Sequence, residues 1–169
     1  SHKGDMVLDP FCGCGTAVVV AERLKRKWIG IDVTHLAVAL MKHRLRDAFG
    51  NKVKYRVIGE PISLPDAKTL AKQNRYQFQW WALGLVSARP VEQKKGADRG
   101  IDGRLYFHDE PDNSKSKTKQ IVISVKSGKM GVRDVRDLRG VLERETAQIG
   151  VLISMEEPTS AMQIEAAGA

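Results

Sequence analysis

Residues 9–16 have the sequence D-P-F-C-G-C-G-T, between an apolar strand predicted over residues 6–8 and a helix predicted over residues 17–24. A glycine-rich turn between a strand and a helix lets a ligand approach the backbone, because glycine has no Cβ and tolerates positive φ. A second apolar strand over residues 28–31 ends at Asp32, where an acid commonly accepts hydrogen bonds from ribose hydroxyls. The pattern predicts half of a nucleoside-cofactor site. A tight turn followed by a structural acid is the alternative.

The string at residues 9–16, with A-E-R-L-K-R-K-W-I-G-I-D at residues 21–32, resembles the S-adenosylmethionine motif of DNA methyltransferases that modify exocyclic amines, adenine N6 or cytosine N4. The resemblance implies a partial Rossmann-like segment with S-adenosylmethionine as its cofactor. Asp9 would then lie near the methionine end of the cofactor, and Asp32 would bind the ribose. The cofactor-binding residues that the resemblance implies are Asp9, Phe11, Gly13, Gly15 and Asp32.

The tetrapeptides D-P-P-Y, N-P-P-Y and S-P-P-Y are absent from the 169 residues. In these methyltransferases that motif holds the target amine, and in permuted members it precedes the cofactor motif. Residues 5–46 supply only a β-α-β-α piece of the sheet. We therefore expect residues 1–58 to be the C-terminal portion of a longer methyltransferase, which alone does not methylate and whose partner is the missing N-terminal portion. Its uncovered strands are expected to pair with a second copy, as a homodimer, or to be poorly ordered.

The net charge of +8 is concentrated near the start of the chain. Residues 1–58 carry 11 Lys and Arg against 5 acids, whereas the remainder carries 17 against 15. Such runs usually form a solvated helix face, but beside a methyltransferase motif they favour contact with the phosphates of double-stranded DNA. No apolar run approaches the ~20 residues that span a bilayer, and two cysteines are too few for a zinc site. We expect a cytoplasmic protein with no membrane partner.

Glycine and proline in residues 56–61 end the first pattern and predict a domain boundary. Ser63 is predicted to cap a helix that follows, and a second helix is expected after a break at Asn74. Trp80 and Trp81 lie on that second helix. They could form a base-stacking platform, but aromatic residues on an amphipathic helix are more often part of the core.

The second domain, predicted over residues 59–169, contains the string G-A-D-R-G-I-D-G at residues 96–103. The strands predicted after this string cover residues 104–107, 120–126 and 149–153, with a helix before the last. Asp102 precedes one strand and Lys126 ends its neighbour, so we expect both at one edge of a sheet. An acid and a lysine together suit phosphodiester hydrolysis, because carboxylates hold the divalent cation that neutralises phosphate charge. A lysine can orient the attacking water or stabilise the developing charge.

This string, the hairpin after it and I-S-V-K at residues 123–126 resemble the Mrr-type branch of the PD-(D/E)xK nuclease superfamily. The resemblance implies a restriction-endonuclease-like domain in which Asp102 binds Mg²⁺ or Mn²⁺ and Lys126 is the catalytic lysine. Ser124 departs from the pattern, because the superfamily usually has Glu, Asp or Gln there and serine is a poor replacement for a carboxylate ligand. Asp98 is a second candidate metal ligand. The candidate catalytic residues are Asp102, Ser124 and Lys126.

Together the two resemblances suggest an α/β protein of the restriction-modification type, with a partial methyltransferase segment followed by a restriction-endonuclease-like core. The leading hypothesis joins the methyltransferase segment to a metal-dependent endonuclease that cleaves DNA. The alternative is a catalytically inactive, nuclease-derived DNA-binding module that positions the methyltransferase. A third hypothesis, a nucleotide-binding protein unrelated to DNA, is excluded if duplex binding depends strongly on salt.

Overall fold

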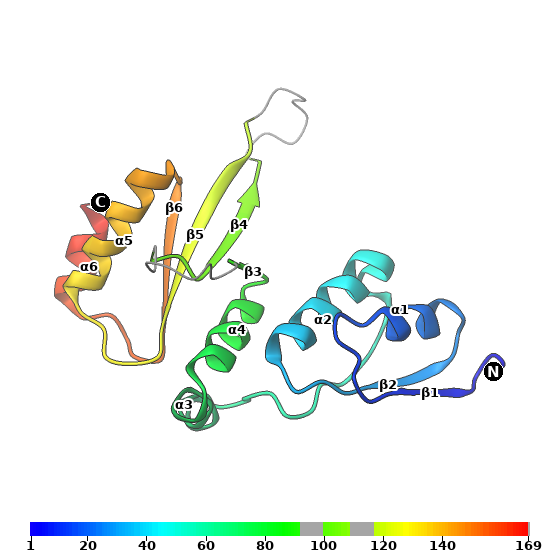
Figure 1. Cartoon of the computed structure of the whole chain (residues 1–169). Helices are drawn as coiled ribbons and strands as arrows, with labels where there is room; N and C mark the ends of the chain where they lie inside the picture. Colours follow the sequence, from blue (N-terminus) through cyan, green and yellow to red (C-terminus); the bar gives the residue numbers. More distant parts are fainter. Residues whose placement is uncertain (92–99, 109–116, 169) are drawn as a thin grey trace. The chain divides into compact units, whose positions relative to one another are not determined.

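A computed structural model describes residues 1–91, 100–108 and 117–168 of the chain (Figure 1). The chain divides into two compact units, Ser1–Pro61 and Ile62–Ala169. Both units combine helices with strands, which confirms the predicted α/β class. None of the helices in the described ranges is long and apolar enough to cross a membrane.

The first unit is built on two parallel strands with a helix after each. Its elements are β1 (Met6–Asp9), α1 (Thr16–Arg23), β2 (Lys27–Gly30), α2 (His35–Phe49) and a 3-10 turn, η1 (Gly50–Lys52). In the ladder Met6 pairs with Lys27, and Asp9 pairs with Gly30. The β-α-β-α order predicted from the sequence is therefore confirmed.

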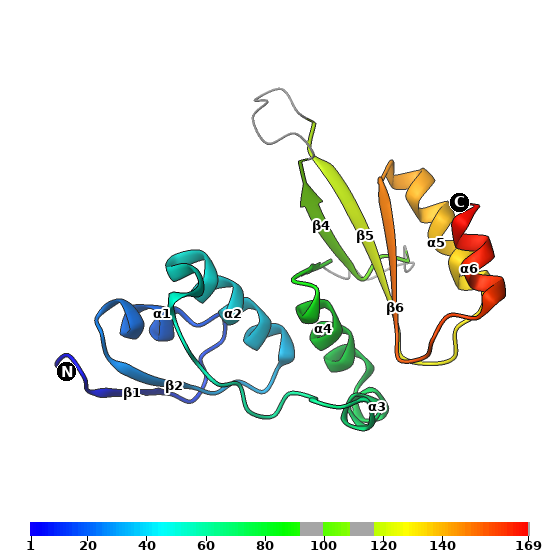
Figure 2. The ribbon, with the colours of Figure 1, turned by 180° about the vertical axis from the view of Figure 1, so that it is seen from behind.

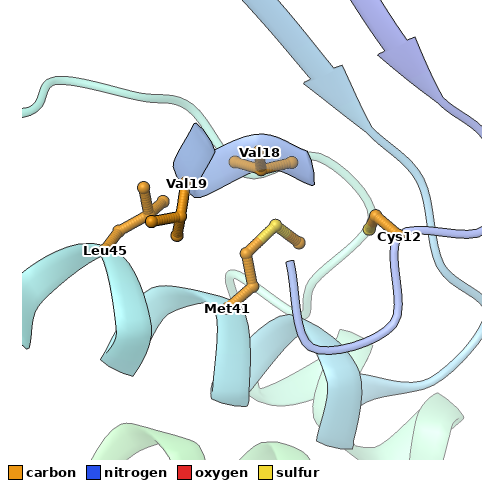
Figure 3. Packing of buried hydrophobic residues seen from close by; sticks show 5 residues of the cluster. All are labelled: Cys12, Val18, Val19, Met41 and Leu45. Carbon is orange, nitrogen blue, oxygen red and sulfur yellow. The ribbon is translucent and has the colours of Figure 1, made fainter. Parts of the chain in front are cut away.

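The core of the first unit lies between the turn after β1 and the two helices (Figure 3). Its buried side chains are Cys12, Val18, Val19, Met41 and Leu45. Because this core occupies one side of the strands, the residues that alternate to the other side are left uncovered. These exposed residues, with 48 to 59% of their surface accessible, are Met6, Leu8, Ile29 and Ile31.

The second unit is a four-stranded mixed sheet with helices around it. Its elements are α3 (Leu64–Gln73), α4 (Arg75–Leu85), β3 (Arg89–Pro90), β4 (Gly103–Phe107), β5 (Lys119–Lys126), α5 (Val132–Glu145), β6 (Ile149–Ser154) and α6 (Ser160–Ala167). The strand order is β3-β4-β5-β6, antiparallel except for the parallel pair β5–β6. The strands predicted as 104–107, 120–126 and 149–153 match β4, β5 and β6.

Strand β5 is the centre of the second core because both of its faces are buried. Val122 packs with Leu138 and Val141 from α5, and Ile123 packs on the other face with Leu83 from α4. Helices α5 and α6 lie together on one side of the sheet (Figure 2). Helix α4 approaches β4 so closely that a Cβ on Gly103 would lie 2.4 Å from Leu83 Cδ2.

The helix boundaries follow the predicted cap at Ser63 and the predicted break at Asn74. Ser63 Oγ accepts a hydrogen bond from Asp66 N at 3.3 Å and begins α3. Asn74 ends α3 and begins α4, since its Oδ1 accepts from the backbone N–H groups of Tyr76 and Gln77. Within α4 the Trp81 ring lies 5.8 Å from the ring of Phe78, which is buried. That contact favours the core interpretation of Trp81 over a base-stacking platform.

Candidate functional sites

The glycine-rich turn of the first unit keeps its shape through two glycines in left-handed backbone. Gly13 has φ +48° and Gly15 has φ +78°. Gly15 N donates to Cys12 O at 2.7 Å, and Gly15 precedes the first residue of α1. A Cβ on Gly15 would lie 2.5 Å from Met41 Cγ, so glycine is required here by both conformation and space.

Asp32 lies just beyond β2 and holds this turn from the opposite side. Its Oδ2 accepts from Gly13 N at 2.9 Å, and its Oδ1 accepts from both the backbone N–H and the hydroxyl of Thr34, each at 2.9 Å. The Thr34 backbone N–H is the main cause that holds the pKa of Asp32 below its ordinary value, and the Gly13 N–H adds to it. The carboxylate is thus ionised at neutral pH and shapes the loop, whether or not it also accepts from a ribose.

The five residues predicted to bind S-adenosylmethionine all lie where β1 and β2 end. The carboxyl end of parallel strands is where open α/β sheets bind their ligands. Asp9 Oδ1 accepts from Phe11 N at 3.2 Å, and the Phe11 side chain is 87% exposed. The glycine backbone, the exposed ring and an ionised carboxylate therefore fit a nucleoside cofactor. S-adenosylmethionine, the cofactor that the resemblance implies, would supply an electrophilic methyl group.

Arg44 is a residue of this site that the sequence analysis did not identify. From α2 its Nη1 donates to Thr16 Oγ1 at 2.8 Å and to Cys14 Sγ at 3.2 Å. The guanidinium of Arg44 thereby links the loop and the start of α1 to α2. Burial, with Asp32 and Asp9 nearby, raises the pKa of the Cys12 thiol, so Cys12 serves as an apolar core residue. No sequence spacing indicates the contact of Arg44, because it depends on how α2 packs on α1.

In the second unit the structure brings Asp102 to the end of β5, as predicted. Asp102 N donates to Ile123 O at 2.9 Å. Its Oδ2 accepts from Val125 N at 2.6 Å and from Ser124 Oγ at 3.4 Å. Ser124 is only 6% exposed. The carboxylate of Asp102 therefore fastens the start of β4 to the end of β5.

Lys126 lies at the same end of β5, but its ammonium group is paired with a different acid. Its Nζ lies 3.1 Å from Oδ1 of Asp134, and Oδ2 of Asp134 accepts from Gly131 N at 2.9 Å at the start of α5. The Gly131 N–H, followed by Lys126, holds the pKa of Asp134 below its ordinary value. Asp134 was not predicted from the sequence. Its position three residues after Gly131 is a helix-capping signal, but that signal does not reveal the lysine partner.

The described residues of this site do not fit a divalent cation. Among them there is no group of three His, Cys, Asp or Glu side chains that could hold a metal ion. Ser124 presents a hydroxyl where cations such as Mg²⁺ favour a carboxylate. Asp98, the second candidate ligand, lies outside the residues that the structure describes.

Comparison with known protein families assigns the two ends of the chain separately. Residues 1–43 match the N6_N4 DNA methylase family. Residues 77–169, more than half of the chain, match the family described as NACHT-associated inactive Restriction Endonuclease 1. The chain belongs to that inactive restriction endonuclease family and carries a methyltransferase-like segment before it. The narrower Mrr-type PD-(D/E)xK assignment is not confirmed by these matches.

The curated relatives are type II methyltransferases. M.HpaI of Haemophilus parainfluenzae is 45% identical over 91 residues, which are 53% of this chain and 29% of that protein. M.EcaI of Enterobacter cloacae is 48% identical over 44 residues, 26% of this chain and 10% of that protein. M.BamHI of Bacillus amyloliquefaciens is 45% identical over 47 residues, 28% and 11% respectively. The chain thus spans less than a third of each of these relatives. No solved structure matches it.

Proposed function

We propose that this chain joins a methyltransferase segment, residues 1–58, to a nuclease-derived module, residues 59–169, that binds duplex DNA without cutting it. The module would position the methyltransferase on its substrate. Membership of an inactive restriction endonuclease family favours this alternative over the leading hypothesis of metal-dependent cleavage. The methyltransferase relatives and the charge of +8 favour DNA over a nucleotide-binding role unrelated to nucleic acid.

The observation that carries the proposal is that the predicted catalytic residues bond to other groups of the protein. A nuclease needs a carboxylate directed at a metal and a lysine directed at the attacked phosphate. Here Oδ2 of Asp102 accepts from Val125 N and Ser124 Oγ, and Lys126 is paired with Asp134. These contacts give Asp102, Ser124 and Lys126 a structural role at the end of β5.

In the first unit the proposed cofactor is S-adenosylmethionine. The backbone of Gly13 and Gly15 would let the cofactor approach the loop, and Phe11 would cover one of its faces. Asp32 would orient the ribose, and Asp9 would lie near the methionine end. The target-amine motif would come from a missing methyltransferase portion, which would pack on the exposed strand residues of the first unit. Two free cysteines, Cys12 and Cys14, suit action in a reducing cytoplasm.

The test combines binding and cleavage on one substrate. The chain is incubated with a supercoiled plasmid and with a duplex oligonucleotide, in chelator, in Mg²⁺ and in Mn²⁺. We expect duplex binding with a steep salt dependence under all three conditions, and an intact plasmid. Asp102→Ala and Lys126→Ala serve as the matched variants. Metal-dependent nicking by the native chain that both variants lose would overturn the proposal in favour of an active nuclease, and absence of duplex binding would overturn it as well.

A further inference from the structure

In the second unit, a cavity of about 290 Å³ lies where the parallel strands β5 and β6 end. Residues of helix α3 and of the turns that follow the two strands line this open cavity. Three of its lining side chains are lysines: Lys68 and Lys72 of α3, and Lys129 after β5. Glu156, which follows β6, is the acid in the lining.

The three lysines of this cavity outnumber the acid of its lining, Glu156. Lys68 and Lys72 are four residues apart on α3, so they occupy the same helix face, an arrangement that disfavours the helix when both are charged. All three lysines are exposed, and within the described part of the chain none of them forms an ion pair. The neighbouring Lys126, by contrast, is neutralised by Asp134. Unpaired positive charge therefore lines the cavity, whereas Lys126, the predicted catalytic lysine, is paired.

The chemistry of the lining indicates what kind of anion fits. The hydroxyl of Ser127 and the backbone at Gly128 add hydrogen-bonding groups beside the lysines. The described residues that line the cavity include no aromatic ring on which a base could stack. Lysine and backbone groups without base contacts are typical of phosphate binding that positions a protein on a duplex.

We propose that this lysine cavity binds a backbone phosphate of duplex DNA, and that α3 supplies the charge which the nuclease-derived site does not. Helix α3 lies outside both family matches, which cover residues 1–43 and 77–169. Helix α3, the first helix of the second unit, thus contributes to the proposed DNA contact. This inference rests on the proposed DNA-binding function and names its contact surface.

The test compares two variants that remove equal charge from the second unit. One is Lys68→Gln/Lys72→Gln, and the control is Lys117→Gln/Arg133→Gln, which changes exposed cations outside the cavity. Affinity for a duplex oligonucleotide is measured over a salt series. We expect the α3 variant to lose on the order of tenfold in affinity at low salt, with the slope of log affinity against log salt reduced by about 2. The control should stay within roughly twofold of the native chain.

A third variant changes affinity in the opposite direction. Glu156→Gln removes the acid of the lining, so it should strengthen duplex binding, whereas loss of a purely structural residue would not. Native-like circular dichroism spectra show that the variants fold. If the native chain binds duplex DNA and the α3 variant binds equally well, the cavity proposal is wrong while the proposed function stands. If binding of inorganic phosphate, but not of duplex, depends on the α3 lysines, the cavity is a free-anion site and the proposal also fails. A native chain that binds no duplex contradicts the proposed function itself.

Discussion

Asp32 and Asp102 are both carboxylates near strand ends, but they hold different parts of the structure in place. Each lies beside a strand end and accepts hydrogen bonds from backbone N–H groups. The bonds of Asp32 shape a glycine turn in which Phe11 is exposed. Those of Asp102 fasten two strands together, and the lysine expected to act with it is paired elsewhere. Residue type and spacing therefore predict where a site lies, whereas the hydrogen-bond and ion-pair partners of each carboxylate bear on whether it is available for chemistry.

The largest loss of stability is expected at Gly15, in the glycine-rich turn of the first unit. Gly15→Ala should destabilise the first unit by about 2–5 kcal/mol, because the new side chain combines left-handed backbone strain with a clash against Met41. Urea unfolding followed by hydrogen exchange in residues 1–61 measures the loss. Gly13→Ala is the control, since its Cβ would meet nothing within 4 Å and only the strain remains. Equal effects of the two substitutions would show that the packing of Met41 on the loop is unimportant.

A smaller loss of stability is expected at Asp102, whose carboxylate links the start of β4 to the end of β5. Asp102→Ala leaves Val125 N–H and Ser124 Oγ without this acceptor, which should lower the free energy of unfolding of the second unit by about 1–3 kcal/mol. Chemical denaturation in the absence of metal gives the value. Asp102→Asn retains an acceptor oxygen and should cost less. An Asp102→Ala variant as stable as the native chain would argue that this carboxylate is kept for catalysis instead of structure.

The ion pair of Lys126 should contribute less, because its side chain is 37% exposed. Lys126→Met is expected to cost about 0.2–1 kcal/mol at neutral pH. Arg133→Met is the matched control, since the Arg133–Asp137 pair is longer, at 3.8 Å, and its side chains are more exposed, at 92% and 67%. Its unfolding free energy should be unchanged within error. If both variants lose the same amount, the Lys126–Asp134 pair is an ordinary surface contact.

The same pair predicts a pH dependence. The pKa of Asp134 is lower in the folded chain than in the unfolded one, so its contribution to stability is present above the unfolded value of about 4 and is lost as pH falls through the folded value. Lys126→Met removes one cause of that depression and should flatten the acid loss. Denaturation midpoints of both proteins across this acid range test the sign. A steeper acid loss in the variant would contradict the assignment.

The smallest effect on stability is expected at the uncovered strand face. Leu8 and Ile29 are 59% and 48% exposed, and we expect this face to bind the missing methyltransferase portion or a second copy. Leu8→Lys/Ile29→Lys should leave unfolding nearly unchanged while it abolishes self-association in light scattering. A native chain that stays monomeric at high concentration, with residues 1–55 protected from protease, would count against an open interface.

Local signals explain what the sequence revealed of this protein. The glycine turn, the acid after β2, the cap at Ser63 and the helix break at Asn74 are short-range patterns, and each lies where it was predicted. The meeting of Asp102 with the end of β5 followed from strand order alone. By contrast, β3 is two residues long and exists through its pairing with β4, and α6 was not predicted. The Asp134 partner of Lys126 and the lysines of α3 also escaped prediction, because both depend on how distant elements pack.

The central claim is that the end of β5, where Asp102 and Lys126 lie, is a structural remnant of a nuclease site. Metal binding tests this claim most directly. Mn²⁺ is titrated into the native chain and into Asp102→Asn while free Mn²⁺ is followed by electron paramagnetic resonance. We predict the same free Mn²⁺ signal for both proteins, with and without duplex DNA. Stoichiometric uptake of Mn²⁺ by the native chain that Asp102→Asn abolishes would contradict the account and restore Asp102 as a metal ligand.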